Sequence, residues 1–247
     1  MGSQSGGPID RSAAIAAFDF RRFEVLTFDC YGTLIDWETG ILRALRAALG
    51  TYARDVHDEE LLTRYAVHEA AAEAGPYLPY RTILARTARA VASELDAPLD
   101  DDAAARFADS VGDWPAFPDS GEALRLLQTR FRLGVITNCD DDLFGRSNER
   151  LGVEFDWVVT AQQAGSYKPN PRNFEVAFER MGVPRERILH VAQSLFHDHV
   201  PARRLGLSTA WINRRRGRPG SGATPPAEAT PDVEAPDMAT FSAAATR

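Results

Sequence analysis

The apolar residues of this chain fall into short runs that are separated by segments of helical length. The runs are FEVLTF, LGVITN, WVVT, ILHVA and TAWIN, at residues 23–28, 133–138, 157–160, 188–192 and 209–213. Apolar residues recur at helical spacing over residues 119–130, 141–152, 170–182 and 198–206. Alternation of strand and helix is typical of a parallel, doubly wound sheet, in which polar residues after the strands gather in one crevice. We therefore expect an α/β core whose functional side chains follow its strands.

Residues 38–114 interrupt this alternation. The segment is rich in Ala, Leu, Arg and Glu and contains no strand-like run. Helices are expected to start near Thr39, Asp58, Pro79 and Asp101. The pattern predicts a helical unit inserted directly after the first strand.

The rest of the chain is assigned around this insert. Residues 21–37 and 115–247 are predicted to form the core, and the small, polar residues at the start of the chain predict a flexible extension over 1–20. Gly, Pro, Ala and Thr are dense over 217–236, which favours an irregular segment before a last helix at 238–245.

Composition excludes several classes of function. The formal charge of −7 argues against nucleic acid as the main partner, because binding phosphate requires a basic surface. No apolar run is long enough to cross a bilayer, and the first residues lack the order of a secretory signal. Cys30 and Cys139 cannot make a disulfide framework. We expect a soluble, cytoplasmic protein with free thiols and no membrane partner.

Polar side chains of chemical interest follow four of the predicted strands. They are Asp29 and Thr33, Thr137 and Asn138, Lys168, and Ser194 with Asp198. Each has an ordinary structural explanation when it is considered alone, since Asp and Asn after a strand usually cap helices or form turns. In a doubly wound sheet, however, all of these side chains would meet at one edge.

The segments FDCYGTLID, ITNCD, YKPNP and AQSLFHD, in this order and with a helical insert after the first, resemble the four motifs of the haloacid dehalogenase superfamily. The resemblance covers the chain from Phe23 onward. It implies a Rossmann-like core with a helical cap, and a hydrolase whose nucleophile is Asp29. Within the superfamily, FDCYGTLIDWE resembles the type II L-2-haloacid dehalogenases.

Two positions depart from the pattern of the phosphatases in this superfamily. Phosphatases carry an acid two residues after the nucleophile, where this chain has Tyr31, and tyrosine is a poor acid because its pKa is near ~10. They also hold magnesium with an acid where this chain has Gln193, and a hard cation prefers carboxylate oxygens. We therefore expect no metal and no cofactor. His197 and His199 flank Asp198, but no further cluster completes a ligand set.

The expected chemistry is displacement of halide by a carboxylate. Asp29 would attack a carbon next to the carboxylate of a short 2-halo acid, giving an ester that water hydrolyses to the 2-hydroxy acid. Halide needs no proton to leave, so neither the missing acid nor a metal is required. Lys168 would keep Asp29 ionised, and Asp198 would hold Lys168 and orient or deprotonate the water.

Thr33 and Ser194 are assigned to the catalytic group, and the other site residues are assigned to binding. Thr33, Thr137 and Ser194 offer hydroxyl donors to the substrate or to the Asp29 carboxylate, and the Asn138 amide could meet the halide. Tyr31 and Gln193 are expected at the pocket wall, and Phe196 is assigned either to the halide pocket or to the core. The resemblance also implies a cap arginine that receives the halide. Arg64, in LLTRYAVHE, is the first choice for it and Arg81 is the alternative.

Three hypotheses remain open on the sequence. The first is a 2-haloacid dehalogenase that acts on a small halo-carboxylate. The second keeps the nucleophile but hydrolyses another small carboxylate, or is a magnesium-dependent phosphatase. The third is a binding protein without turnover, which leaves Asp29, Lys168 and Asp198 without a purpose. A homodimer is expected from the resemblance alone.

Overall fold

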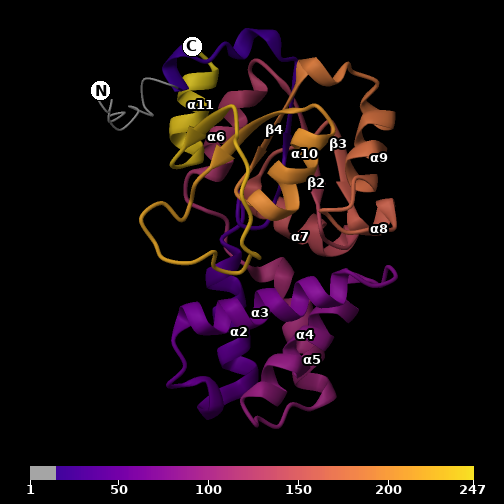
Figure 1. Cartoon of the computed structure of the whole chain (residues 1–247), viewed down its shortest axis with the longest axis vertical. Helices are drawn as coiled ribbons and strands as arrows, with labels where there is room; N and C mark the ends of the chain where they lie inside the picture. Colours follow the sequence, from indigo (N-terminus) through magenta and orange to yellow (C-terminus); the bar gives the residue numbers. More distant parts are fainter. Residues whose placement is uncertain (1–14) are drawn as a thin grey trace, which may run out of the picture.

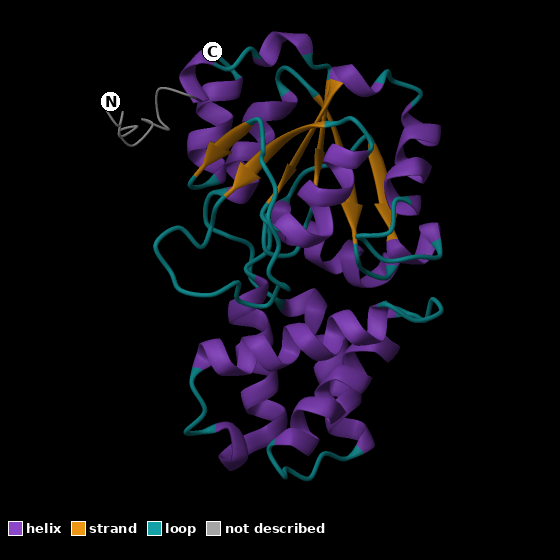
Figure 2. Ribbon diagram, viewed as in Figure 1, coloured by secondary structure: helices purple, strands orange, loops and turns teal. Residues whose placement is uncertain are grey.

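Two bodies make up the computed structural model, which describes residues 15–247 (Figure 1). One contains a twisted sheet with helices on both sides, and the other consists of helices and loops (Figure 2). The strands end on the side that faces the helical body (Figure 2). This arrangement is an α/β Rossmann-like core with a helical cap, as the sequence predicted.

The sheet is entirely parallel, with the strand order β3-β2-β1-β4-β5-β6. Its strands are β1 (Val25–Phe28), β2 (Arg132–Thr137), β3 (Trp157–Thr160), β4 (Ile188–Ala192), β5 (Ser208–Ile212) and β6 (Val233–Ala235). Phe28, the last residue of β1, pairs with Val135 on one side and Val191 on the other. The chain therefore runs outward from β1 in both directions, which places a topological switch point beside this strand.

Apolar side chains cover both faces of the sheet because successive residues of a strand point to opposite sides. Val25 packs in one buried cluster with Phe174, whereas Leu26 packs in another with Leu124 and Phe241. The helices that provide these contacts are α6 (Ser120–Gln128), α7 (Asp141–Leu151), α9 (Arg172–Met181), α10 (Val200–Arg204) and α11 (Met238–Ala245). Burial on both faces explains why the strands are continuous apolar runs.

The cap contains four long helices that begin within two residues of their expected positions. They are α2 (Trp37–Leu49), α3 (Asp58–Glu73), α4 (Tyr80–Glu94) and α5 (Asp101–Asp109). Fully buried Leu45, Leu61 and Leu84 contribute to the apolar interior of the cap. Short 3-10 turns over Gly50–Ala53 and Ser110–Asp113 complete it.

Several details differ from the expectation. The N-terminal extension was predicted over residues 1–20, of which 1–14 lie outside the described residues. The prediction is wrong for residues 15–20, because Ile15 and Phe20 are buried and the ring of Phe20 lies 5.7 Å from that of Phe241 in α11. Strand β6 lies in the segment that was expected to be irregular.

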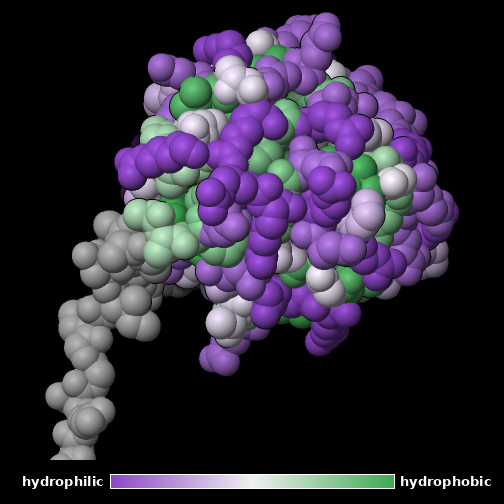
Figure 3. All heavy atoms as spheres, turned by 90° about the horizontal axis from the view of Figure 1, so that it is seen from above, coloured by the Kyte–Doolittle hydropathy of each residue, from purple (hydrophilic) through white to green (hydrophobic). Residues whose placement is uncertain are grey.

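The helix predicted over 198–206 starts earlier, as a π-helical turn over Leu195–His199 that leads into α10. The short helix α8 (Ala161–Ala164) and the 3-10 turns over Phe20–Arg22 and Arg185–Arg187 were not predicted. No helix within residues 15–247 is both long and apolar enough to cross a membrane. The face seen from above carries hydrophobic side chains in small groups among hydrophilic ones (Figure 3).

Candidate active site

Asp29 lies immediately after β1, at the switch point of the sheet. Its N–H donates to the carbonyl of Val191 in β4 at 3.1 Å, which extends the pairing of the two strands by one residue. The chain then turns at Gly32, which has φ +90. A Cβ atom there would lie 2.8 Å from Nε1 of Trp37, so the turn that presents Asp29 needs glycine.

Lys168 joins two carboxylates below the cap. Its Nζ lies 2.9 Å from Oδ1 of Asp29, 2.6 Å from Oδ1 of Asp198 and 2.8 Å from the carbonyl of Ile136. The lysine and both aspartates are buried. All three ammonium protons therefore have acceptors, which fixes the lysine between the two acids.

The protonation states of Asp29, Lys168 and Asp198 depend on one another. Burial raises the pKa of Asp29 above its usual value and Asp198 acts in the same direction, while Lys168 opposes the rise. Burial alone would also raise the pKa of Asp198, but Lys168 and His190 hold it well below its usual range. Burial disfavours the Lys168 ammonium, yet the two carboxylates outweigh burial and raise its pKa. Lys168 is thus the charge that makes an ionised Asp29 tolerable in this interior.

Thr33 orients the other oxygen of the nucleophile. Its hydroxyl donates to Oδ2 of Asp29 at 2.7 Å and accepts a hydrogen bond from the N–H of Gln193 at 2.9 Å. Each oxygen of Asp29 therefore has its own donor. The N–H groups of Cys30 and Tyr31 form no hydrogen bond with any protein atom of the described chain, so they are free to receive a ligand.

His190, which the sequence analysis missed, supports Asp198 from inside the sheet. Its Nε2 lies 2.9 Å from Oδ1 of Asp198, and its Nδ1 lies 2.9 Å from Oγ1 of Thr27. The signal in the sequence is a histidine within the otherwise apolar strand ILHVA. Oδ2 of Asp198 has no hydrogen-bond partner among the described residues, so this oxygen remains available to a water or a substrate.

Asn138 holds the loop that carries Lys168. Its Oδ1 accepts from the N–H of Lys168 at 2.7 Å, and its Nδ2 donates to the carbonyl of the same residue at 2.9 Å. These two bonds use the oxygen and an N–H of the amide, so Asn138 positions the backbone of Lys168. The hydroxyl of Thr137 is buried and has no partner within residues 15–247.

Tyr31, Ser194 and Phe196 are further predicted site residues, and each makes different contacts. The hydroxyl of Tyr31 is 2.9 Å from Oγ of Ser147, and burial raises its pKa well above the usual value. It therefore cannot replace the acid of the phosphatases. Ser194 accepts from the N–H of His197 at 2.9 Å and begins the π-helical turn. Phe196 lines an outer pocket instead of the catalytic cavity.

Neither predicted arginine reaches the nucleophile. Arg64 pairs with Glu60 at 2.7 Å and with Glu94 at 2.5 Å, on the outside of the cap. Arg81 pairs with Asp109 and Asp142 at 2.9 and 2.7 Å. The assignment of Arg64 or Arg81 to the halide pocket is therefore wrong for this structure. The reason is helical phase: at about 100° per residue, position 64 lies roughly 180° around α3 from the residue that does face the site, Glu73.

Two glutamates of α3 face the nucleophile instead. The cavity over Asp29 has a volume of about 20 Å³. It is lined by Asp29, Tyr31, Trp37, Glu69, Glu73, Tyr80, Asn138, Lys168, Ser194, His197 and Asp198. Glu69 accepts hydrogen bonds from the hydroxyls of Tyr65 and Tyr80 at 2.5 and 2.6 Å. Burial raises its pKa to about 7, and burial next to Glu69 raises the pKa of Glu73 well above its usual value.

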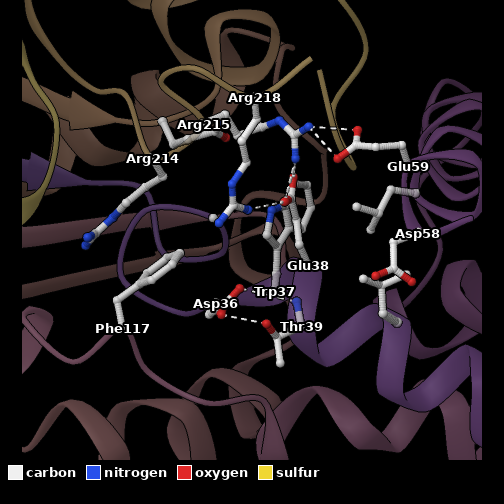
Figure 4. Close-up of a pocket in the computed structure, with 14 residues that line it drawn as sticks. Asp36, Trp37, Glu38, Thr39, Asp58, Glu59, Phe117, Arg214, Arg215 and Arg218 are labelled. Carbon is white, nitrogen blue, oxygen red and sulfur yellow. Dashed lines mark hydrogen bonds and ion pairs between the residues drawn. The ribbon is translucent and has the colours of Figure 1, made fainter. Parts of the chain in front are cut away.

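A wider pocket is lined by residues of the cap and by arginines of the loop after β5 (Figure 4). It has a volume of about 250 Å³, and Gly32 and Gln193 are among its lining residues. In its wall Arg215, from the loop after β5, contacts Glu38 and Glu59 of the cap (Figure 4). Oε1 of Gln193 is buried without a partner in the described chain.

The donors around Asp29 do not fit a magnesium ion. Gln193 is an amide instead of a carboxylate, and it lines the wider pocket but not the cavity over Asp29. The ammonium of Lys168 lies between the two aspartates. Within residues 15–247, no group of three or more His, Cys, Asp or Glu residues is arranged to bind a metal. The chemistry that remains is nucleophilic attack by the oriented carboxylate of Asp29.

Comparison with known proteins places this site in a family. A family model described as haloacid dehalogenase-like hydrolase matches residues 23–195. The chain is 28% identical over 200 residues to haloacetate dehalogenase H-2 of Moraxella sp. (strain B), an alignment that covers 78% of this chain and 87% of that enzyme. It is 31% identical over 212 residues to a 5-amino-6-(5-phospho-D-ribitylamino)uracil phosphatase of Escherichia coli (strain K12), covering 79% of this chain and 86% of the phosphatase.

The fold matches that of L-2-haloacid dehalogenase from Xanthobacter autotrophicus, in a structure with chloropropionic acid covalently bound. The TM-score is 0.73 at 18% identity, and the match covers 90% of this chain and 97% of the other. At this identity the likeness concerns the fold alone. Since the family model spans more than half of the sequence, the chain belongs to the haloacid dehalogenase-like hydrolases.

Proposed function

We propose that this hydrolase removes halide from a short 2-halo carboxylic acid through an aspartyl ester on Asp29, without a metal ion. The observation that carries the proposal is the position of Lys168. Its ammonium lies within 2.9 Å of Asp29 and 2.6 Å of Asp198, so a fixed side chain supplies the positive charge that a nucleophilic carboxylate needs here.

In the first step an oxygen of Asp29 attacks the carbon that bears the halogen. The new C–O bond forms as the carbon–halogen bond breaks, and the halide leaves with the bonding electrons. The free N–H groups of Cys30 and Tyr31 and the hydroxyl of Thr137 are candidate donors to the substrate carboxylate. These donors hold the carbon close to Asp29 without adding charge.

In the second step water attacks the carbonyl carbon of the ester at Asp29. The free Oδ2 of Asp198 accepts a proton from this water, while Lys168 and Thr33 donate to the oxygens of the reacting carboxyl group. The ester then splits into the 2-hydroxy acid and the Asp29 carboxylate. The balance for the whole reaction is one water consumed, and one halide and one proton released.

The cavity over Asp29, of about 20 Å³, has room for roughly one water molecule, which is too little for a substrate. The cap must move away from the core for binding. Similarity to haloacetate and 2-haloacid dehalogenases supports the choice of substrate. The phosphatase relative supports phosphate esters as the alternative, but Tyr31 and Gln193 remove the acid and the metal ligand that this chemistry needs.

The test is halide release from chloroacetate, fluoroacetate and L-2-chloropropionate in the presence of EDTA. The wild type should release halide, Asp29→Asn should lose at least about 1,000-fold in rate, and Asp102→Asn, exposed on α5, should match the wild type. A single turnover in water enriched in oxygen-18 should place the heavy oxygen in the peptide that contains Asp29. Magnesium-dependent hydrolysis of a phosphate ester without any halide release would refute the proposal.

A further inference from the structure

The catalytic cavity contains an excess of acidic side chains for an enzyme whose substrate and products are anions. Asp29 and Asp198 share one ammonium, and Glu69 and Glu73 line the same cavity from the cap. Arg64 and Arg81 pair with acids elsewhere. A halide that leaves into this cavity therefore needs a donor other than arginine.

Glu73 occupies the boundary between the cavity and the outside. It is at the C-terminal end of α3, and its side chain is 6% exposed. Glu73 and Lys168 line both the cavity over Asp29 and an outer pocket of about 370 Å³, whose wall also includes Tyr77, Tyr167 and Phe196. A side chain at this boundary can contact the halide as it leaves the substrate carbon and also as it moves to the outside.

The neighbours of Glu73 favour its uncharged form. Glu69 lies one helical turn before Glu73. The phenols of Tyr65, Tyr80 and Tyr167 are also nearby, and none of these groups supplies a positive charge that would stabilise a Glu73 carboxylate. His197 lies 4.0 Å away, and burial lowers its pKa to about 4, so it is neutral. Among residues 15–247, Lys168 is the cation that opposes this effect, and its protons are already taken by Asp29, Asp198 and Ile136.

The single hydrogen bond of Glu73 to the core is long. Nδ2 of Asn138 lies 3.3 Å from its Oε2 and 3.5 Å from its Oε1, and the same amide makes its shorter bond to Lys168. The two tyrosine hydroxyls go to Glu69 instead. Of the two glutamates, Glu73 is therefore the one with a carboxyl group that has room to donate.

We propose that Glu73, as a carboxylic acid, donates the hydrogen bond that receives the departing halide. This inference rests on the proposed function and assigns to a neutral acid the part that the sequence analysis gave to a cap arginine. The carbon–halogen pair of electrons leaves on the halide, which accepts a hydrogen bond from the Glu73 hydroxyl. The proton stays on Glu73, so the overall balance is unchanged.

The test compares two substitutions of similar size. Glu73→Gln keeps an N–H donor but cannot ionise, whereas Glu73→Leu removes the donor. Losing a hydrogen bond to a charged group should lower kcat/KM of Glu73→Leu by about 10- to 100-fold and weaken inhibition by bromide by a similar factor. Glu73→Gln, which keeps a weaker N–H donor, should lose clearly less kcat/KM than Glu73→Leu. Glu60→Leu, on the exposed side of α3, is the control and should stay within about threefold of the wild type.

The pH profile gives a readout that a purely structural role would not move. Because the acid form donates, kcat/KM of the wild type should fall as the pH rises past the raised pKa of Glu73, and Glu73→Gln should lose that alkaline fall. Glu73→Gln carries this test by itself if Glu73→Leu does not fold. Wild-type rates and bromide inhibition in a folded Glu73→Leu, or an alkaline fall that persists in Glu73→Gln, would overturn the assignment of Glu73 alone. Absence of halide release from the wild type would instead overturn the proposed function, and this inference with it.

Discussion

The guanidinium of Arg215 binds both carboxylate oxygens of Glu38, at 2.7 and 2.6 Å (Figure 4). Arg215 belongs to the core, in the loop after β5, and Glu38 lies at the start of the first cap helix, α2. The other amino group of Arg215 contacts both oxygens of Glu59 in α3, at 2.8 and 2.7 Å. One side chain thus fastens two cap helices to the core beside the nucleophile loop.

Removing this contact should loosen the cap. Arg215→Met removes the shortest contacts of Glu38, whose side chain is 14% exposed, and should lower the free energy of unfolding by about 1–3 kcal/mol. Hydrogen exchange should quicken at the starts of α2 and α3. The control is Arg218→Met, because Arg218 is 64% exposed and lies 3.7 Å from Glu38. It should change the free energy of unfolding by less than about 0.5 kcal/mol. Equal effects of the two variants would contradict this account.

Lys168 should matter for both stability and activity. Lys168→Met leaves two buried carboxylates facing each other, so we expect a loss of about 3–5 kcal/mol in the free energy of unfolding at neutral pH. Asp29 should then remain protonated to higher pH and lose its nucleophilicity, because Lys168 opposes the rise in its pKa that burial causes. Chemical denaturation and halide release measure the two effects.

A double variant separates the charge of Lys168 from its packing. Asp29→Asn removes one of the two facing carboxylates, so it should restore part of the stability that Lys168→Met loses. In the wild-type background the same change should be destabilising or neutral. A double variant that is no more stable than Lys168→Met would show that packing around the lysine, instead of its charge, holds the site together.

Arg64 should prove dispensable for the reaction. The side chain is 28% exposed and its partners, Glu60 and Glu94, lie on the outside of the cap. Arg64→Gln should therefore keep kcat/KM for halide release within about twofold of the wild type and change the free energy of unfolding by about 1 kcal/mol or less. A drop of 10-fold or more in kcat/KM, in a variant that folds normally, would show that Arg64 takes part in the reaction.

The elements that could be predicted from the sequence are those whose burial requires a recognisable pattern of neighbouring residues. Strands buried on both faces are continuous apolar runs, and the cap segment is rich in Ala, Leu, Arg and Glu without any strand-like run, so both were found. Strand β6 was missed because three residues, Val233–Ala235, are too few to stand out between proline-rich segments. Phe20 was missed because its burial depends on contact with Phe241, more than two hundred residues away in the chain.

The site residues also divide into those that a sequence pattern can predict and those whose position depends on how distant parts of the chain pack. Asp29, Lys168 and Asp198 could be predicted to lie together, because the carboxyl ends of parallel strands meet at one edge of the sheet. Which face of a cap helix meets that edge depends instead on how the cap docks. The motif resemblance chose Arg64, yet the docking of α3 turns Glu69 and Glu73 inward. No local pattern in α3 reports this rotation, since its helical faces differ little in hydropathy.

Glu69 should make the stability of the protein depend on pH. Its pKa rises from 4.5 to about 7 on folding because burial disfavours the charged form. The stabilising contribution of the protonated group is therefore complete below about pH 4.5 and is lost as the pH rises to about 7. The loss above that pH is about 3 kcal/mol, from roughly 1.4 kcal/mol per pKa unit.

Glu69→Gln keeps an oxygen for the two tyrosine hydroxyls but does not titrate. The variant should therefore gain stability relative to the wild type as the pH rises from about 4 to about 8, by up to about 3 kcal/mol. Urea denaturation at a series of pH values measures this difference, with Glu60→Gln on the exposed side of α3 as the control. A difference that stays constant over this range would mean that Glu69 folds as a carboxylate, held by Tyr65 and Tyr80, and that Glu73 faces a charge instead of a neutral acid.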